Sequence, residues 1–137
     1  MARDKFHDEV RLALESDGWQ ITDDPLSFKI GKLQVQIDLG AERVIAAERG
    51  ADKIAVEIKT FGSPSFITAL YEAVGKYVIY RSVLKEMQPE RMLFLAIPKS
   101  IFNRFFEESV IQQLIQDEDF KIIIYDQHSQ IITKWIK

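Results

Sequence analysis

The sequence of 137 residues contains no cysteine and only two histidines, four prolines and six glycines. Without cysteine the chain forms no disulfide, has no thiol nucleophile and cannot bind zinc or an iron–sulfur cluster through thiolates. His7 and His128 alone are too few for a histidine-rich metal site. Any metal ion would therefore have to be bound by carboxylates.

Long hydrophobic runs are also missing. Charged residues interrupt the apolar segments well before the roughly 18 to 20 residues that a membrane-spanning helix needs, and the N-terminus lacks the apolar core of a secretion signal. With 47% hydrophobic and 28% charged residues, a chain of this length can form one core but not two. We therefore expect a single cytoplasmic domain over residues 1–137.

The chain has no overall excess of positive charge, because its formal net charge is −3. Nucleic-acid binding would then need a local basic patch or a partner. Residues 76–104 have six basic and two acidic residues, whereas residues 1–24 have three basic and seven acidic ones. The basic stretch is either an ordinary solvated surface or a phosphate-contacting patch, with Lys76, Arg81 and Lys85 as candidates.

The first half of the chain predicts a helix followed by strands. Residues 3–17 carry apolar side chains at helical spacing. Residues 19–39 are extended around an Asp-Asp-Pro turn, and within them Leu33–Leu39 alternates apolar with polar residues. Arg43–Glu48 and Lys53–Thr60 are rich in strand-forming residues and predict a hairpin.

The second half predicts the longest helix. From Ser65 to Met87 apolar residues recur every three or four positions, after a proline suited to a first helical turn. The remaining predicted elements are a strand over Met92–Ile97, a helix over Ile101–Gln116, and strands over Lys121–Tyr125 and Ile131–Ile136. The order α-β-β-β-β-α-β-α-β-β favours an α/β fold, a mixed sheet covered by helices, in which the long helix is a crossover.

An acid and a lysine interrupt the otherwise apolar segment Ile54–Lys59. Glu57 and Lys59 are two residues apart, so both lie on the same face of the predicted strand. An unpaired buried charge is costly, so each must pair, reach water or bind an ion.

The preceding strand offers further carboxylates. If Gly50 and Ala51 are the two hairpin loop residues, Glu42 lies opposite Lys59 and shares its face. Asp38 is four residues earlier, with the same parity, just before a glycine at which the chain can bend. Two or three acids and one lysine would then converge.

Such a cluster suits Mg²⁺ or Mn²⁺, which prefer carboxylate oxygens and keep several waters when weakly bound. The ion could activate water and neutralise a phosphodiester, while the lysine orients that water. The alternative is a set of cross-strand ion pairs on the solvated side of a sheet.

An acid, a hairpin, then Glu-x-Lys and a helix resemble the PD-(D/E)xK nuclease superfamily. More closely, the blocks Ile37–Glu48, Ile54–Phe61 and Gly75–Arg81 resemble the XisH family of cyanobacterial fdxN element excision controlling factors. The resemblance extends over nearly the whole chain. It implies a restriction-endonuclease-like core and a role in programmed excision of a DNA element during heterocyst development, together with a site-specific recombinase and a small companion excision factor.

The resemblance also implies site residues. Glu57 and Lys59 match the superfamily motif as catalytic residues, and the remaining metal-binding acid is Asp38 or Glu42. Many superfamily nucleases add a glutamate from the first helix, and Glu9 is either that residue or a helix-flank carboxylate.

One position departs from the family. Where relatives are expected to have glutamine, this chain has Lys76, which puts catalytic competence in question. Glu72 lies four residues earlier and predicts a simple ion pair with Lys76.

Two functions remain open at this point. The chain is either a metal-dependent DNA nuclease or a non-catalytic scaffold that docks the companion factor and the recombinase. Because few cations are available, we expect it to bind DNA weakly on its own. Its oligomeric state is left open.

Overall fold

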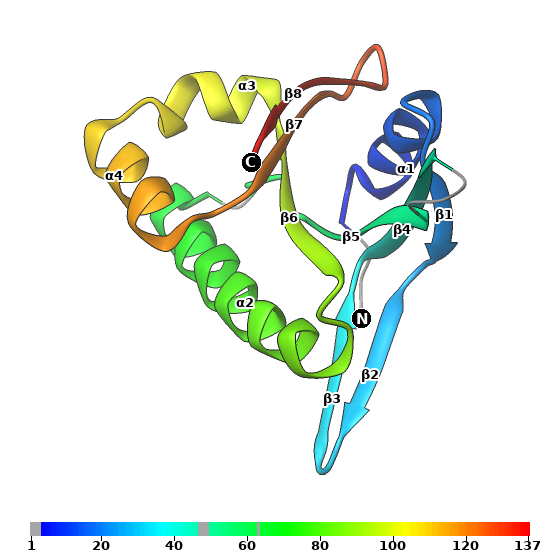
Figure 1. Ribbon diagram of the computed structural model, residues 1–137. Coiled ribbons are helices and arrows are strands. Elements are labelled where there is room, and N and C mark those ends of the chain that lie inside the picture. The colour runs from blue at the N-terminus through cyan, green and yellow to red at the C-terminus, as the bar shows by residue number, and fades with distance from the viewer. Residues whose placement is uncertain (1–3, 47–49, 63) are drawn as a thin grey trace.

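The computed structural model describes residues 4–46, 50–62 and 64–137. It contains a six-stranded mixed sheet of order β1-β4-β5-β6-β7-β8 and a separate two-stranded sheet of β2 and β3 (Figure 1). Strands β5, β6 and β7 are parallel, and the other neighbouring pairs are antiparallel. The elements are α1 (His7–Ser16), β1 (Gln20–Asp23), β2 (Leu26–Ile30), β3 (Leu33–Ile37), β4 (Leu39–Ala46), β5 (Gly50–Ile58), α2 (Phe66–Met87), β6 (Arg91–Pro98), α3 (Lys99–Ile101), the π-helix η1 (Phe102–Phe106), α4 (Ser109–Glu118), β7 (Ile122–Asp126) and β8 (Ile131–Ile136).

Each face of the main sheet has its own buried apolar cluster, because successive side chains of a strand point to opposite faces. From β6, Leu93, Leu95 and Ile97 join the cluster beneath α2 and α4, whereas Phe94 and Ala96 join the cluster beneath α1. Figure 1 shows α1 on one side of the sheet and α2 with α4 on the other. The layers confirm the predicted α/β class with a mixed sheet.

The long helix α2 confirms the predicted crossover, since it connects the parallel strands β5 and β6. Ser65 is its N-cap, and the Ser65 hydroxyl accepts a hydrogen bond from the Thr68 amide at 3.2 Å. Pro64 therefore precedes the cap instead of lying in the first turn. None of the helices in the described ranges is both long and apolar enough to cross a membrane.

The predicted strand over residues 33–39 is confirmed as far as Ile37 but ends there as β3, and five strands rather than four precede α2. The chain turns over at Asp38: Ile37 is buried in the cluster beneath α2, and Leu39 is buried in the cluster beneath α1. Side chains two residues apart face the same side of a regular strand, so this pair requires a break between them.

The predicted hairpin register is wrong as well. Gly50 and Ala51 belong to β5, and the connection falls on residues 47–49, outside the described residues. Glu42 is consequently opposite Lys53 instead of Lys59, and Leu39 is opposite Val56. The return strand starts earlier than predicted, which shifts the pairing partners of residues 39–44 by an even number of residues and leaves each side chain on its predicted face.

The predicted helix Ile101–Gln116 is interrupted. The chain forms α3, then the π-helix η1, and starts α4 only at Ser109. Phe106 is buried and stacks on Phe102 with 5.6 Å between ring centroids, and it also contacts the ring of Phe61 edge-on. Packing of these aromatic side chains outweighs the local preference for a continuous α-helix.

Candidate functional site

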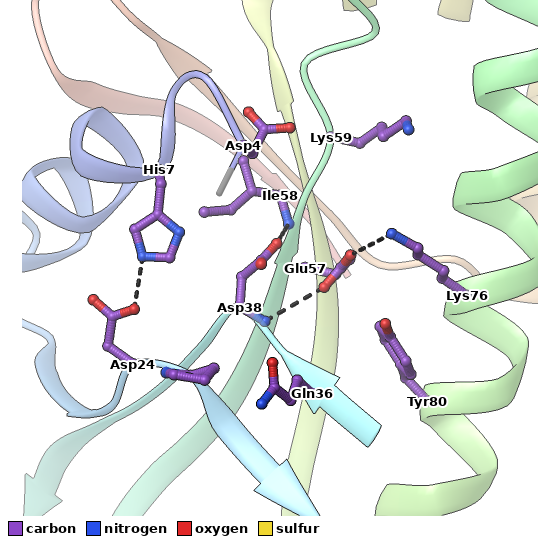
Figure 2. A pocket seen from close by; sticks show the side chains of 11 residues that line it. Asp4, His7, Asp24, Gln36, Asp38, Glu57, Ile58, Lys59, Lys76 and Tyr80 are labelled. Carbon is purple, nitrogen blue, oxygen red and sulfur yellow. Dashed lines mark hydrogen bonds and ion pairs between the residues drawn. The ribbon is translucent and has the colours of Figure 1, made fainter. Parts of the chain in front are cut away.

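The break at Asp38 places its carboxylate opposite the end of β5. The Ile58 amide donates a hydrogen bond to Asp38 Oδ2 at 2.8 Å, and the Asp38 amide donates a longer one to Glu57 Oε1 at 3.4 Å (Figure 2). A backbone amide at the end of β5 thus binds the carboxylate of Asp38, and the amide of Asp38 binds the carboxylate of Glu57. Two acids that are 19 residues apart in the chain become neighbours.

Among the residues that the structure describes, Glu57 is the only buried acid, with 5% of its surface exposed. The pKa of Glu57 is raised from 4.5 to about 8, chiefly by burial and secondly by the charge of Asp38, while the ammonium of Lys76 opposes both effects. Lys76 Nζ lies 3.7 Å from Glu57 Oε2. In the absence of a cation, the buried carboxyl group therefore keeps a proton at neutral pH.

The lysine of the Glu-x-Lys motif pairs with an acid on α2. Lys59 Nζ donates a hydrogen bond to Glu72 Oε2 at 2.9 Å, and this bond lowers the pKa of Glu72. Two contacts therefore join α2 to the end of β5, Glu72 with Lys59 and Lys76 with Glu57, in place of the predicted Glu72–Lys76 pair within the helix. Helix α2 passes beside the end of β5, so Glu72 and Lys76 can both contact residues there.

These groups open into a cavity of about 590 Å³ between α1, the β2–β3 sheet and α2 (Figure 2). The cavity provides room for a solvated ion and part of a substrate. Its lining residues are Asp4, His7, Asp24, Pro25, Gln36, Asp38, Glu57, Ile58, Lys59, Lys76 and Tyr80.

Tyr80 is a cavity residue that the sequence reasoning missed. Its pKa is raised to about 12, first by burial and then by the charges of Glu57 and Asp38, so the phenol stays protonated and can donate a hydrogen bond. It lies one helical turn after Lys76 on α2. That i,i+4 spacing was the available signal.

Three cavity residues near the N-terminus were also missed. Asp4 accepts hydrogen bonds from the amide and hydroxyl of Thr60, at 3.2 and 3.3 Å. His7 Nε2 lies 2.7 Å from Asp24 Oδ1. No local pattern marks these contacts, because the Asp4–Thr60 pair is 56 residues apart in the chain.

Two predicted site residues lie outside the cavity. Glu42 pairs with Lys53, which precedes Glu57 by four residues of β5, and this separation is about 13 Å at the rise of a strand. Glu9 lies near Tyr125, whose pKa is raised by burial and by the charges of Asp4 and Glu9. The structure therefore selects Asp38 over Glu42 as the neighbour of Glu57.

The three candidate DNA-contacting cations are not brought together. Lys76 lines the main cavity, whereas Arg81 and Lys85 line a second cavity of about 250 Å³. Arg81 Nη1 donates to the Glu118 carbonyl oxygen at 2.6 Å, at the end of α4. Lys85 lies in the last turn of α2, and Arg81 contacts the last turn of α4. Each cation therefore lies at the negative end of a helix dipole and stabilises that helix.

The donor set fits a weakly held hard cation. Within the described parts of the chain, no three His, Asp or Glu side chains are placed to hold a metal together. Asp38 and Glu57 supply two carboxylates beside open space, which is how Mg²⁺ is commonly bound, with water completing its shell. A divalent ion would also relieve the repulsion that raises the pKa of Glu57.

Comparison with known proteins identifies the same family over nearly the whole length. The chain matches the family model described as XisH protein over residues 1–133. A solved XisH family protein from Nostoc punctiforme PCC 73102 is 39% identical with a TM-score of 0.88, covering 98% of this chain and 100% of that one. An fdxN element excision controlling factor protein from Anabaena variabilis is 38% identical with a TM-score of 0.89 and the same coverage. A search of curated proteins found no match.

Proposed function

The chain belongs to the XisH family, and we propose that it controls excision of a DNA element as a restriction-endonuclease-like domain that hydrolyses phosphodiesters with Mg²⁺ or Mn²⁺. The observation that carries the proposal is the pairing of Asp38 with Glu57 in an open cavity, with Lys59 one residue beyond the end of β5. The similar protein from Anabaena variabilis is named an excision controlling factor, which supports the biological setting.

Each polar residue of the cavity has its own role in the proposed hydrolysis. Asp38 and Glu57 would hold the ion, which supplies Lewis acidity and charge neutralisation when bound. Lys59, held in place by its hydrogen bond to Glu72, serves as a positive charge for the phosphate and as a donor that orients the attacking water. Tyr80 adds a neutral hydrogen-bond donor on the α2 side of the cavity.

A specific contact favours the second candidate function, a non-catalytic scaffold. The Lys76 ammonium, 3.7 Å from Glu57 Oε2, partly supplies the positive charge that a metal would otherwise bring. In that case the nuclease fold would serve to dock DNA, a recombinase or a small companion excision factor. Weak DNA binding by the isolated chain is expected under both functions, because its net charge is −3.

Calorimetric titration with Mn²⁺ separates the two functions. We expect modest affinity for the wild type and none for Glu57→Ala, because one carboxylate does not retain the ion. Below about pH 8 the uptake should release a proton, since Glu57 is protonated there before the ion binds.

Glu42→Ala is the matched control, because Glu42 lies on the same sheet face but outside the cavity. Its titration should match the wild type. Identical Mn²⁺ uptake by wild type and Glu57→Ala would remove the metal site and leave the scaffold function.

A further inference from the structure

The two-stranded sheet of β2 and β3 is a ribbon that extends away from the main sheet. Figure 1 shows it projecting past the C-terminal end of α2, with a tight turn at its tip. Its register pairs Ser27 with Gln36, Lys29 with Gln34 and Ile30 with Leu33, so Gly31 and Lys32 form the tip.

The two faces of the ribbon differ sharply. Leu26, Phe28 and Ile37 are buried in the cluster beneath α2, which anchors one face to the body. The opposite face is polar and exposed. We call it the ribbon face; it consists of Ser27, Lys29, Gln34 and Gln36, with Lys32 at the tip.

The ribbon face is unusual in its charge. Residues 25–37 include two lysines and no acid, in a chain whose acids outnumber its basic residues by 21 to 18. Neither Lys29 nor Lys32 has an ion-pair partner among the residues that the structure describes. Both ammonium groups are therefore available to an anionic partner.

The ribbon face leads into the carboxylate cavity. Gln36 lines that cavity, and Gln34, Gln36 and Asp38 follow one another at every second residue. From Lys32 at the tip to Gln36 at the cavity, four residues of strand span about 13 Å. That length corresponds to about four nucleotides at 3.4 Å per step. Lysines on an open ribbon also discourage edge pairing, but this role does not account for a glutamine row that ends at the cavity.

We propose that the ribbon face binds duplex DNA beside the phosphate that occupies the carboxylate cavity. A two-stranded ribbon fits the DNA major groove, glutamine amides can hydrogen-bond to base edges, and lysines can contact backbone phosphates. Lys29 and Lys32 take the phosphate role, and Gln34 and Gln36 take the base-edge role. The inference rests on the proposed function, because it takes DNA as the substrate.

Fluorescence anisotropy with a short labelled duplex tests the inference, at several salt concentrations and with a chelator present so that no cleavage occurs. We expect Lys29→Ala/Lys32→Ala to bind about tenfold or more weakly than wild type, with a log–log salt slope shallower by about 1.8, for two lost phosphate contacts. Lys99→Ala/Lys134→Ala removes the same charge at other exposed positions and should reproduce the wild-type slope.

A second measurement reports the location directly. Because the chain has no cysteine, Leu33→Cys accepts a single fluorophore at the ribbon tip, where Leu33 is 61% exposed. Energy transfer to an acceptor-labelled duplex should appear on binding, and Lys29→Ala/Lys32→Ala should need about tenfold more protein to reach the same transfer.

Equal affinity and equal salt slope in the ribbon and control variants would overturn the inference, as would a wild-type chain that binds no duplex at low salt. Metal uptake and DNA cleavage are measured separately, so the proposed function can stand when the ribbon assignment fails. RNA duplex bound in preference to DNA would likewise overturn the assignment.

Discussion

Replacing Glu57 by glutamine is expected to raise the melting temperature by about 5–10 °C near pH 9 and to change it little near pH 5. The pKa of Glu57 is about 8 in the folded chain against an ordinary 4.5, chiefly because the group is buried and secondly because Asp38 is close. The stabilisation from protonated Glu57 is fully present below pH 4.5 and is lost as the pH rises through about 8. At roughly 1.4 kcal/mol per pKa unit, the loss is a few kcal/mol.

Glutamine has nearly the same shape and stays neutral, so the variant avoids this loss at alkaline pH. Thermal unfolding followed by circular dichroism across the pH range measures the difference. Glu72→Gln is the control, because Glu72 is exposed and its pKa is lowered rather than raised. A drop of many degrees near pH 9 in Glu57→Gln would instead make ionised Glu57 a structural partner of Lys76.

Arg91→Ala is expected to destabilise the fold by about 1–3 kcal/mol, because it leaves the carbonyl oxygen of the buried Ile54 without the guanidinium that donates to it. The Arg91 side chain is only 8% exposed. It donates to the carbonyl oxygen of Ile54 at 2.8 Å and to Asp23 Oδ2 at 3.3 Å, which joins the start of β6 to β5 and β1. Arg91 is therefore a structural cation, although it belongs to the basic stretch of the sequence.

Urea unfolding checks the size of this effect. Arg91→Lys should lie between wild type and Arg91→Ala, because lysine keeps the charge but not the planar fork. The exposed Arg104→Ala should change stability by no more than about 0.5 kcal/mol. Wild-type stability in Arg91→Ala would show that these hydrogen bonds contribute nothing.

Local patterns were sufficient for much of the fold. The three-to-four residue repeat over residues 65–87 predicted α2, and the short apolar segment before Pro98 predicted β6. The break at Asp38 was not predictable from alternation, since Ile37 and Leu39 keep the pattern of a strand while packing in two different clusters.

Some residues of the site could likewise be predicted from local patterns, and others could not. Strand alternation alone placed Glu57 and Lys59 on one face, and the resemblance to nucleases gave them a role. The choice between Asp38 and Glu42 depended on where the hairpin turns, which the residue pattern does not specify. Asp4 and His7 reach the cavity only through tertiary packing, so no spacing rule identifies them.

Metal-dependent nicking of supercoiled DNA tests the central claim most directly, with Mg²⁺ or Mn²⁺ and with or without the small companion factor proposed above. The account predicts that the wild type nicks DNA only when the ion is present. The nicking rate should fall at least about 100-fold in Asp38→Asn, Glu57→Gln and Lys59→Ala. Glu42→Gln should keep the wild-type rate. Wild-type nicking by Glu57→Gln, or no nicking by the wild type under any of these conditions, would contradict it.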